Sequence, residues 1–494
     1  MRRLLRILVI GVCIFLEISD AANILAIFPT PSVSHQVIFR PLTQELARRG
    51  HKVTVITTDP VFTNADSPAN LTEIDVHDDS YKLWRKGFVY GLEFGRKETV
   101  YKQIETAMNI MKKLTVMHVE SDKIQQLIND KNNNFDLILI EAWTRQALIY
   151  SFIFKAPVIL QRLYNLTFGE KLHELYKHWW FKTTWFSKEN EEITEFRKVL
   201  GPTLPKYDDL QNNVDMLFLN SHPMWFDNQP LPSNVISIWG IHKKPEKELP
   251  KDLQSYLDSS KNGVIYLSFG TNAPSTTLPS DFIQLLIRVI SKLPYDVLWK
   301  WENDEMPGKS KNIKISKWFP QSDLLKHPKV KLFITQGGLQ STEEAITAGV
   351  PLIGIPMLGD QWYNVEKYEK HKIGVRLDME TITEDKFETA IETVIHDKSY
   401  KENIIRLRSL MNDQPESALD RAVWWTEYVL RHGGAKHLRA AGANMFWTEY
   451  YEIEFMLKLG AIVFLFVLTF LVIMYLLYVN IVQKFMSNIK VKVM

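Results

Sequence analysis

The chain has 494 residues, of which 46% are hydrophobic and 23% are charged, and this balance excludes an intrinsically disordered protein. The length exceeds what one hydrophobic core usually serves, so we expect two domains of roughly 200 residues each. The formal net charge of +2 at pH 7 gives no electrostatic basis for a nucleic-acid partner, and we expect none.

Residues 1–21 have the pattern of a cleaved signal peptide, because three arginines precede an apolar stretch at Leu8–Leu16 and small residues lead to Ala21. The apolar stretch is too short to span a bilayer, which favours cleavage over a retained anchor. Cys13 is the only cysteine and lies inside this segment. The mature protein is therefore expected to form no disulfide and no cysteine-based metal site.

Residues 22–242 alternate between strand-like and helix-like patterns. A helix is predicted over His35–Arg49, where apolar residues recur at helical spacing before Gly50. The predicted strands of this half are Ile24–Phe28, Lys52–Thr57, Phe135–Ile140 and Val158–Leu160. A strand, a helix and a second strand in succession form a β-α-β unit, which predicts a parallel sheet with helices on its faces.

An aromatic-rich stretch, LHELYKHWWFKTTWFSKEN, occupies residues 172–190 and includes Trp179 and Trp180. Its composition suits a core helix, a lid over an apolar ligand or a patch that touches a membrane, and the sequence favours none of the three.

Residues 243–262 are rich in Lys, Glu and Pro at their start and are interpreted as an interdomain linker. The alternation then restarts and continues over residues 263–430. The predicted elements are strands at Val264–Phe269, Val297–Trp301, Ile313–Ile315, Leu332–Thr335 and Leu352–Ile355, with helices at Ser280–Lys292 and Ser341–Ala348. This indicates a second doubly wound sheet. The phosphate-loop and dinucleotide fingerprints are absent from the sequence, as are spaced His/Asp metal ligands.

The segment FITQGGLQSTEE begins at Phe333 and places two glycines between a strand and a helix. Ligands of open parallel sheets bind at the carboxyl ends of the strands, and the N-terminus of a helix attracts an anion. Gly338 permits close approach of the backbone, while Gln336 and Gln340 supply neutral donors. This corner is predicted to bind a diphosphate.

Two other strand ends of this half add small polar groups and an indole. Ser268, Gly270 and Thr271 follow the first strand, and Trp318 and Gln321 follow a short one. An aromatic face stacks on a base, and a glutamine amide reads both donor and acceptor edges of a pyrimidine. These residues are predicted to bind a pyrimidine nucleotide.

A fourth strand end carries Asp360 and Gln361, whose carboxylate and amide suit sugar hydroxyls. Base, diphosphate and sugar together describe a nucleotide sugar.

Three segments resemble the UDP-glycosyltransferases, and more narrowly the membrane-bound UDP-glucuronosyltransferases. They are FITQGGLQSTEEAITAGVPLIGIPMLGDQ from Phe333, WFPQSDLLKHP from Trp318 and LDRAVWWTEYVLRHGGAKHLR from Leu419. The resemblance covers essentially the whole chain. It implies an α/β fold of the GT-B type, in which two Rossmann-like, doubly wound domains face each other across a cleft. It also implies that the C-terminal domain holds the donor.

The resemblance assigns a donor contact to each matching position. Trp318 would stack on uracil, Gln321 would contact the uridine and Glu344 would take the ribose hydroxyls. The remaining assignments are Ser268, Gly270, Thr271, Gly338 and Gln340 at the phosphates, and Asp360 and Gln361 at the sugar. One position departs from the pattern: many members have His where this chain has Gln336. A glutamine still donates but carries no charge, so we expect weaker stabilisation of the leaving group.

Transfer to a hydroxyl also needs a general base, for which histidine is well suited near neutral pH. His35 follows the first strand and opens a helix, at the position where the family places its catalytic histidine. A carboxylate partner would orient the imidazole. Asp136 and Glu141 flank one strand, and we select Glu141 because it lies at the carboxyl end. The family generally has Asp there.

Residues 431–457 lead to a predicted membrane-spanning helix at residues 458–479, in which Leu459–Val479 carry no charge and have the length that a bilayer demands. The tail, residues 480–494, contains lysines and no acid, which favours the cytoplasmic side. Together with a cleaved signal this predicts a single-pass type I protein with a lumenal body. The sequons at Asn70 and Asn165 fit that topology, and the terminal KVKVM resembles a dilysine signal for the endoplasmic reticulum.

The sequence therefore predicts an inverting hexosyltransferase of the endoplasmic reticulum membrane, of the UDP-glucuronosyltransferase type. It would move a glucuronosyl or glucosyl group from UDP-glucuronate or UDP-glucose to a hydroxyl of a small lipophilic acceptor, without a metal or a further cofactor. A non-catalytic membrane module that binds or chaperones with the same fold is the alternative, to which Gln336 and Glu141 give weight. Membrane lipid is an expected partner, and self-association as a homo-oligomer is compatible with the resemblance and the anchor.

Overall fold

The structure is a computed structural model of the whole chain. It describes residues 21–62, 66–91, 93–96, 100–130, 133–142, 144–149, 158–159, 192–228, 231–440, 442, 445, 447–450 and 452–493. Contacts divide the chain into one unit at 1–436 and a second at 437–494. The signal segment before Ala21, the sequon at Asn165 and the aromatic-rich stretch with Trp179 and Trp180 lie outside the described residues.

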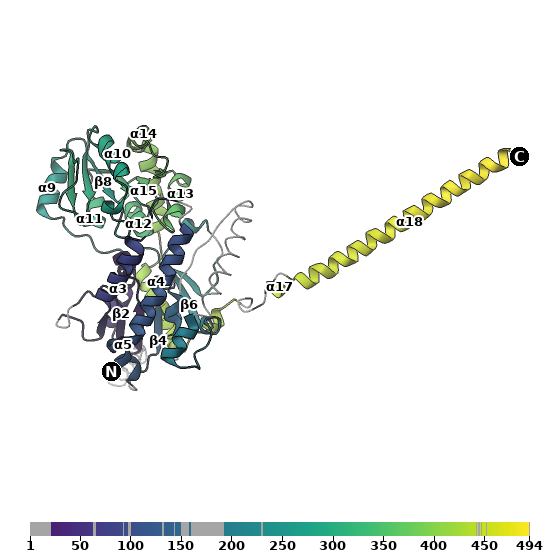
Figure 1. Cartoon of the computed structure of the whole chain (residues 1–494), viewed down its shortest axis with the longest axis horizontal. Coiled ribbons are helices and arrows are strands. Elements are labelled where there is room, and N and C mark those ends of the chain that lie inside the picture. Colours follow the sequence, from purple (N-terminus) through teal and green to yellow (C-terminus); the bar gives the residue numbers. More distant parts are fainter. Residues whose placement is uncertain are drawn as a thin grey trace, which may run out of the picture. The chain divides into compact units, whose positions relative to one another are not determined.

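The first unit contains two parallel sheets (Figure 1). The N-terminal sheet has the strand order β3-β2-β1-β4-β5-β6-β7. Its strands are β1 (Asn23–Phe28), β2 (Lys52–Thr57), β3 (Leu71–Asp75), β4 (Leu137–Ile140), β5 (Val158–Ile159), β6 (Val214–Leu219) and β7 (Val235–Ser237). Its central strands are buried along nearly their whole length, as expected of a parallel sheet covered on both faces.

The helical elements of the N-terminal half follow the strands in the order expected of β-α-β units. They are α2 (Val33–Arg48), α3 (His77–Trp84), the π-helical turn η1 (Arg85–Val89), α4 (Val100–Glu120), α5 (Asp122–Asn129), η3 (Arg145–Leu148), α8 (Tyr207–Gln211) and η4 (Pro223–Phe226). A further helix covers 192–200. Helix α2 buries Leu42 and Leu46, which lie one turn apart on one face.

The C-terminal sheet has the strand order β10-β9-β8-β11-β12-β13. Its strands are β8 (Val264–Ser268), β9 (Asp296–Lys300), β10 (Ile313–Ser316), β11 (Val330–Thr335), β12 (Leu352–Gly354) and β13 (Gly374–Arg376). The alternating side chains of β8 enter two separate cores: Ile265 and Leu267 pack into one cluster, while Val264 and Tyr266 pack into the other. The sheet is thus covered on both faces.

Helices cover the two faces of this sheet and complete the first unit. They are α9 (Lys251–Ser259), η5 (Ser275–Thr277), α10 (Ser280–Ile290), α11 (Gln321–Leu325), α12 (Leu339–Ala348), α13 (Gln361–Lys370), α14 (Glu384–His396) and α15 (Lys398–Asn412). Two elements follow them in the chain: α16 (Ala418–Arg431), and the turn η6 (Lys436–Leu438) at the boundary with the second unit.

Helix α9 falls within the segment expected to be a linker. It buries Leu253 and Leu257, which lie one turn apart, in a core of the C-terminal half. Residues 243–250 and 260–262, on either side of α9, are without regular structure. The second half of the expected linker is therefore an integral part of the C-terminal domain.

Helix α16 falls within the range expected for the C-terminal domain but packs on α2 of the N-terminal half. Arg49 donates to Glu427 at 3.3 Å, and Arg421 donates to the carbonyl of Ser237 at 3.1 Å. The chain therefore returns to the N-terminal domain after completing the second sheet.

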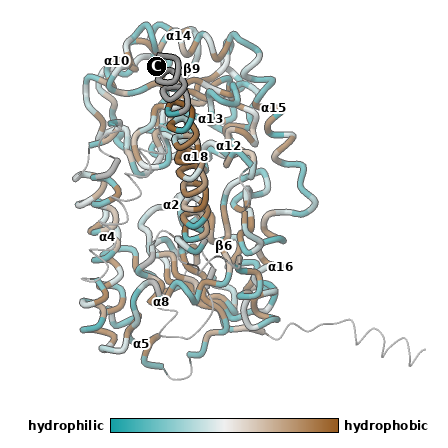
Figure 2. The backbone as a smooth tube through the Cα atoms, turned by 90° about the vertical axis from the view of Figure 1, so that its right-hand side faces the viewer, coloured by the Kyte–Doolittle hydropathy of each residue, from teal (hydrophilic) through white to brown (hydrophobic). Residues whose placement is uncertain are grey.

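The second unit contains α17 (Trp447–Tyr450) and α18 (Ile453–Val493). Within α18, Ile453–Gln483 is long and apolar enough to cross a membrane, and Figure 2 shows this stretch as a mostly brown, hydrophobic tube. The predicted apolar segment at 458–479 lies inside it.

Candidate active site

His35 and Glu141 are in direct contact at the carboxyl edge of the N-terminal sheet. The imidazole Nδ1 of His35 forms a hydrogen bond with Oε1 of Glu141. Thr30 donates its hydroxyl to the second carboxylate oxygen, Oε2, at 2.6 Å. Glu141 is buried, whereas 39% of the His35 side chain is exposed. The arrangement is a hydroxyl–carboxylate–imidazole chain with its histidine at the surface.

Strand register brings these residues together. Strands β1 and β4 pair in parallel with Ile27 opposite Ile140, so both end at the same edge. Glu141 follows β4 directly, and His35 is the third residue of α2, which begins soon after β1 ends. Asp136, the other carboxylate candidate, lies at the opposite end of β4, where Oδ2 accepts from the backbone N–H of Asn23 at 2.8 Å.

The electrostatics keep His35 basic. Burial lowers the pKa of His35, but the carboxylate of Glu141, and then that of Asp360, outweigh this and raise it above 6.5. Asp360 belongs to the C-terminal domain. Desolvation raises the pKa of Asp360 above its usual value, although a hydrogen bond from Asn364 and the charge of His35 lower it in part. The imidazole and a carboxylate of the opposite domain therefore interact.

The glycine corner of the C-terminal domain has the backbone that its sequence predicts. Gly337 has φ of +89°, and a Cβ on it would lie 2.4 Å from Val365 Cγ2, so only glycine fits there. Gly338 is the residue before α12. Gly270, with φ of +76°, lies against the amide of Gln336. The loops after β8 and β11 thus converge.

Gln336 is buried at this point. Its Oε1 accepts no hydrogen bond from any part of the chain that the structure describes. Of the other predicted phosphate contacts, Ser268 ends β8 and is buried, Thr271 lies in the same loop, and Gln340 lies in the first turn of α12. An unpaired amide oxygen needs a hydrogen-bond donor, which a sugar hydroxyl supplies and a phosphate oxygen does not.

The predicted uridine contacts lie along one edge of the same domain. Gln321 donates to Glu344 Oε2 at 2.7 Å and to Ser341 Oγ at 2.9 Å, and its own Oε1 accepts from Tyr266. Desolvation raises the pKa of Glu344 to about 7, although the hydrogen bond from Gln321 opposes this. Trp318 is 61% exposed, so its indole face is available for stacking.

The predicted sugar contacts differ in how they are held. Asp360 accepts from Asn364 at 2.9 Å, and Asn364 also donates to the carbonyl of Gly337. Gln361 is buried, and its Oε1 accepts from the backbone N–H groups of Met357 and Leu358. The side-chain amide oxygen of Gln361 is therefore already hydrogen-bonded within the loop.

Direct contacts join the two domains beside these groups. Asn272, in the loop after β8, donates to Ser32 Oγ at 3.1 Å, three residues before His35. The backbone N–H of Gly95 donates to the carbonyl of Met357 at 2.9 Å. The predicted donor loops and the predicted base thus lie on facing parts of one unit.

Sequence reasoning missed two supporting residues. Thr30, which donates to Glu141, lies just after β1, and its place at a strand end is the signal that points to it. Asn364 lies four residues after Asp360 on α13, the spacing at which helical side chains meet.

A buried carboxylate that the sequence did not mark lies beside the predicted ribose contact. Glu343 is fully buried on α12, and neither of its carboxylate oxygens accepts a hydrogen bond from the described residues. His242 Nδ1 lies 3.4 Å from Oε2, and Lys243 Nζ lies 4.0 Å from Oε1. Burial raises the pKa of Glu343 to about 8 against the charge of Lys243, and lowers that of His242 to about 4. We expect both groups to be neutral near pH 7.

Groups of three or more His, Cys, Asp or Glu side chains that would hold a metal do not occur among the described residues.

Comparison with known proteins identifies relatives along most of the chain. Residues 155–488 match the family model described as UDP-glucoronosyl and UDP-glucosyl transferase. UDP-glucosyltransferase 2 of Dactylopius coccus is 33% identical over 89% of this chain and 90% of the relative. Ecdysteroid UDP-glucosyltransferase of the Spodoptera littoralis nuclear polyhedrosis virus is 32% identical over 90% and 95%. Human UDP-glucuronosyltransferase 2B15 is 28% identical over 88% and 89%.

Solved structures share the fold. A glycotransferase of kitacinnamycin matches with a TM-score of 0.58 and 17% identity, over 82% of this chain and 99% of that chain. Arabidopsis thaliana UGT89C1 in complex with UDP matches with a TM-score of 0.55 and 16% identity, over 83% and 99%. These are GT-B glycosyltransferases, and the two parallel sheets described above have that architecture.

Proposed function

Because this chain belongs to the UDP-glycosyltransferase family, we propose that it transfers glucose from UDP-glucose to a hydroxyl of a small lipophilic acceptor, with inversion and with His35 as the general base. The observation that carries the proposal is the bond from His35 to buried Glu141, opposite Asp360 of the donor domain.

The proposed proton transfer follows from this bond. A carboxylate accepts, so Nδ1 of His35 carries the proton and Nε2 is the nitrogen that takes the acceptor's hydroxyl proton. Glu141 fixes this tautomer and stabilises the imidazolium that forms, and Thr30 holds Glu141 in place. The acceptor oxygen attacks the anomeric carbon from the side opposite UDP, the bond to the β-phosphate oxygen breaks, and the configuration inverts.

The leaving diphosphate would lie at the glycine corner. The N-terminus of α12 and the amide of Gln336 face negative charge that grows as the bond to UDP breaks. Gln336 supplies a neutral donor, and we expect the helix N-terminus to provide most of the stabilisation. No metal and no cofactor beyond the donor sugar is part of this proposal.

Glucose is the proposed donor sugar for two reasons. The relatives from Dactylopius coccus and from the nuclear polyhedrosis virus, at 33% and 32% identity, both carry the name UDP-glucosyltransferase. The sugar end of the predicted site also carries the carboxylate of Asp360, which would repel the carboxylate of glucuronate. UDP-glucuronate is the second candidate, favoured by the human relative.

A competition assay tests the donor. Full-length protein in membranes receives equal concentrations of UDP-glucose and UDP-glucuronate with a phenolic acceptor, and the two conjugates are quantified together. We expect the glucoside to dominate, and an excess of glucuronide would reverse the assignment. In the same assay His35→Ala should abolish both conjugates, whereas product formation at the wild-type rate would remove His35 as the base.

We also propose that the body is lumenal and anchored by α18 in the endoplasmic reticulum membrane. Asn70, in a sequon, is exposed just before β3, where a glycan fits without disturbing the fold. Loss of an endoglycosidase-sensitive mass in Asn70→Gln would support this orientation, and a cytosolic epitope on the body would contradict it.

A further inference from the structure

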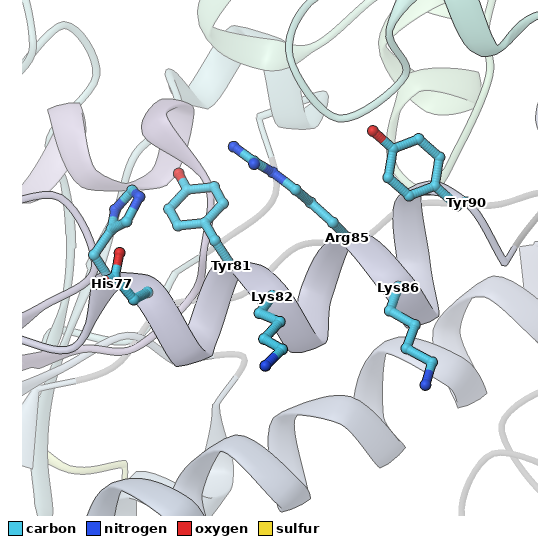
Figure 3. Close-up of a pocket in the computed structure, with 7 residues that line it drawn as sticks. His77, Tyr81, Lys82, Arg85, Lys86 and Tyr90 are labelled. Atoms are coloured by element: carbon cyan, nitrogen blue, oxygen red, sulfur yellow. The ribbon is translucent and has the colours of Figure 1, made fainter.

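Four side chains share one face of the segment that follows β3. His77, Tyr81 and Arg85 are spaced four residues apart, and Tyr90 comes five residues later. They line a hollow of about 530 Å³, and Figure 3 shows all four on the same side of the helix.

The π-helical turn is what keeps Tyr90 on this face. In an α-helix a step of five residues turns the side chain by about 140° from its starting direction. In η1 the backbone N–H of Tyr90 instead donates to the carbonyl of Arg85 at 3.0 Å, and this wider turn brings Tyr90 nearer to the face of Arg85. A single π-turn of this kind is uncommon and occurs frequently at functional sites.

The members of this face are already held in place. His77 Nδ1 bonds to the carbonyl of Thr58 at 2.6 Å, and its ring packs on Tyr81 with centroids 4.4 Å apart. The Tyr81 hydroxyl donates to the carboxylate of Asp59 at 3.1 Å. The guanidinium of Arg85 lies over the Tyr81 ring, 5.3 Å from its centroid. His77, Tyr81 and Arg85 thus form a preformed stack with the guanidinium at one end.

The charge of this hollow is predominantly positive. Within the described residues Arg85 has no carboxylate within 4 Å, and it is exposed. Lys82 and Lys86 also line the hollow, although in Figure 3 they point to the other side of the helix, and the carboxylates of Asp78 and Asp59 offset part of the positive charge. Tyr90 is 71% exposed, and in Figure 3 it lies on the other side of Arg85 from Tyr81, toward which the guanidinium points. An exposed guanidinium next to aromatic side chains suits a flat anion.

The hollow lies on the same sheet edge as the proposed base. Asp59 and His77 follow β2 and β3, and His35 follows β1, which is the next strand after β2. The Arg40 guanidinium of α2, the helix that carries His35, donates to the carbonyl of Asp59 at 2.5 Å. The hollow and His35 are therefore joined through one helix.

We propose that this face is an acceptor subsite for a planar aromatic anion, with Arg85, held against Tyr81, binding its carboxylate, sulfonate or phosphate group and the exposed ring of Tyr90 packing on its ring. The proposal rests on the glycosyltransferase function in one respect, namely that the bound molecule carries the hydroxyl that reacts at His35. Arg85 sets specificity for the anionic end of the acceptor and takes no part in the bond changes.

Two acceptors of equal shape test it. The full-length protein is assayed with 6-hydroxy-2-naphthoate and with its neutral carboxamide, and kcat/KM is measured for each. Charged hydrogen bonds are strong, so we expect wild type to favour the acid by about 10-fold or more. Arg85→Gln should remove that preference while leaving the carboxamide within about two-fold, and Arg85→Lys should restore part of it.

Lys113→Gln is the matched control, because Lys113 is an exposed cation on α4. An equal loss for acid and carboxamide in Arg85→Gln, or no acid preference in wild type, would overturn the subsite. Titration of the naphthoate by its own fluorescence, without donor, separates this result from the enzymatic proposal. If turnover is absent but Arg85→Gln weakens naphthoate binding and Lys113→Gln does not, the subsite stands and the transferase proposal falls. Equal binding by all three proteins refutes the subsite.

Discussion

The Nδ1 atom of His35 and the Oε1 atom of Glu141 are hydrogen-bonded across 106 positions of sequence, between a surface imidazole and a buried carboxylate. Their contact depends on one strand pairing, Ile27 with Ile140, that ends both strands at the same edge. The glutamate side chain at this position, which is one methylene longer than that of aspartate, reaches the imidazole ring.

Removal of the Glu141 charge should impair turnover more than donor binding. In Glu141→Gln the imidazole loses the anion that stabilises its protonated form, and we expect kcat to fall about 10²- to 10⁴-fold. The KM for UDP-sugar should change little. Asp136→Asn, at the other end of the same strand, is the control and should keep wild-type kcat. Wild-type turnover in Glu141→Gln would show that the carboxylate does not assist the base.

The pH dependence of kcat/KM should report the same pair. Only neutral His35 accepts a proton, so activity should fall as pH drops through its pKa, which Glu141 and Asp360 raise above 6.5. In Glu141→Gln the acidic limb should move to lower pH. The raised pKa also stabilises the fold below about pH 6.5, and this contribution is lost as pH rises through the folded value. An unmoved limb would exclude His35 as the titrating group.

Substitution of Trp318 should weaken binding of the donor and leave binding of the acceptor unchanged. Base stacking on an aromatic ring is worth about 1–3 kcal/mol, so Trp318→Ala should raise the KM for UDP-sugar about 5- to 150-fold and leave acceptor KM unchanged. Trp318→Phe should recover part of the loss. Trp424→Ala removes another exposed tryptophan, 47% exposed on α16, and should leave both constants unchanged. Isothermal titration with UDP provides the direct measurement.

Gly270→Ala should damage the diphosphate corner. Its Cβ would lie 2.3 Å from Nε2 of Gln336, so the amide must move, and we expect weaker UDP binding together with a lower kcat. Gly433→Ala is the matched control, because Gly433 has a similar φ of +61° but open space around its Cβ position. That variant should lose about 1–2 kcal/mol of stability through backbone strain while keeping its UDP affinity. Equal effects on UDP affinity would mean that the clash is irrelevant.

The buried carboxyl of Glu343 should make stability depend on pH. With a pKa near 8, the folded protein keeps a proton that the unfolded chain releases near pH 4.5, so stability should decrease as pH rises between these values. Glu343→Gln removes this dependence and should melt a few °C above wild type at pH 8.5 and together with it at pH 5. Glu388→Gln, on the exposed face of α14, should follow wild type throughout. Scanning fluorimetry across pH makes the comparison.

The regular elements were predictable because their patterns are local. Residues Lys52–Thr57 coincide with β2, and the predicted helix at His35 begins two residues earlier, at Val33. The start differs because the carbonyl of Ser32 already accepts from the backbone of His35 and Gln36, which closes the first turn.

The parts that sequence alone missed depend on tertiary packing. Composition marked residues 251–259 as linker, since their Lys, Asp and Ser residues mask the pair Leu253 and Leu257 that α9 buries. Glu343 looks like a solvent-exposed acid next to Glu344, and only the fold places it in the interior. The alignment of Tyr90 with Arg85 depends on a π-turn that no residue spacing announces.

The return of α16 to α2 has a mechanical consequence. The polypeptide crosses between the two halves at 243–250 and again at 413–417, so a protease cut in the first crossing would leave the halves covalently tied by the second. Two connections between the halves permit rotation about the line that joins the connections and restrict rotation about other axes. We expect opening or closing of the two halves to change the distance between His35 and the glycine corner along this one rotation.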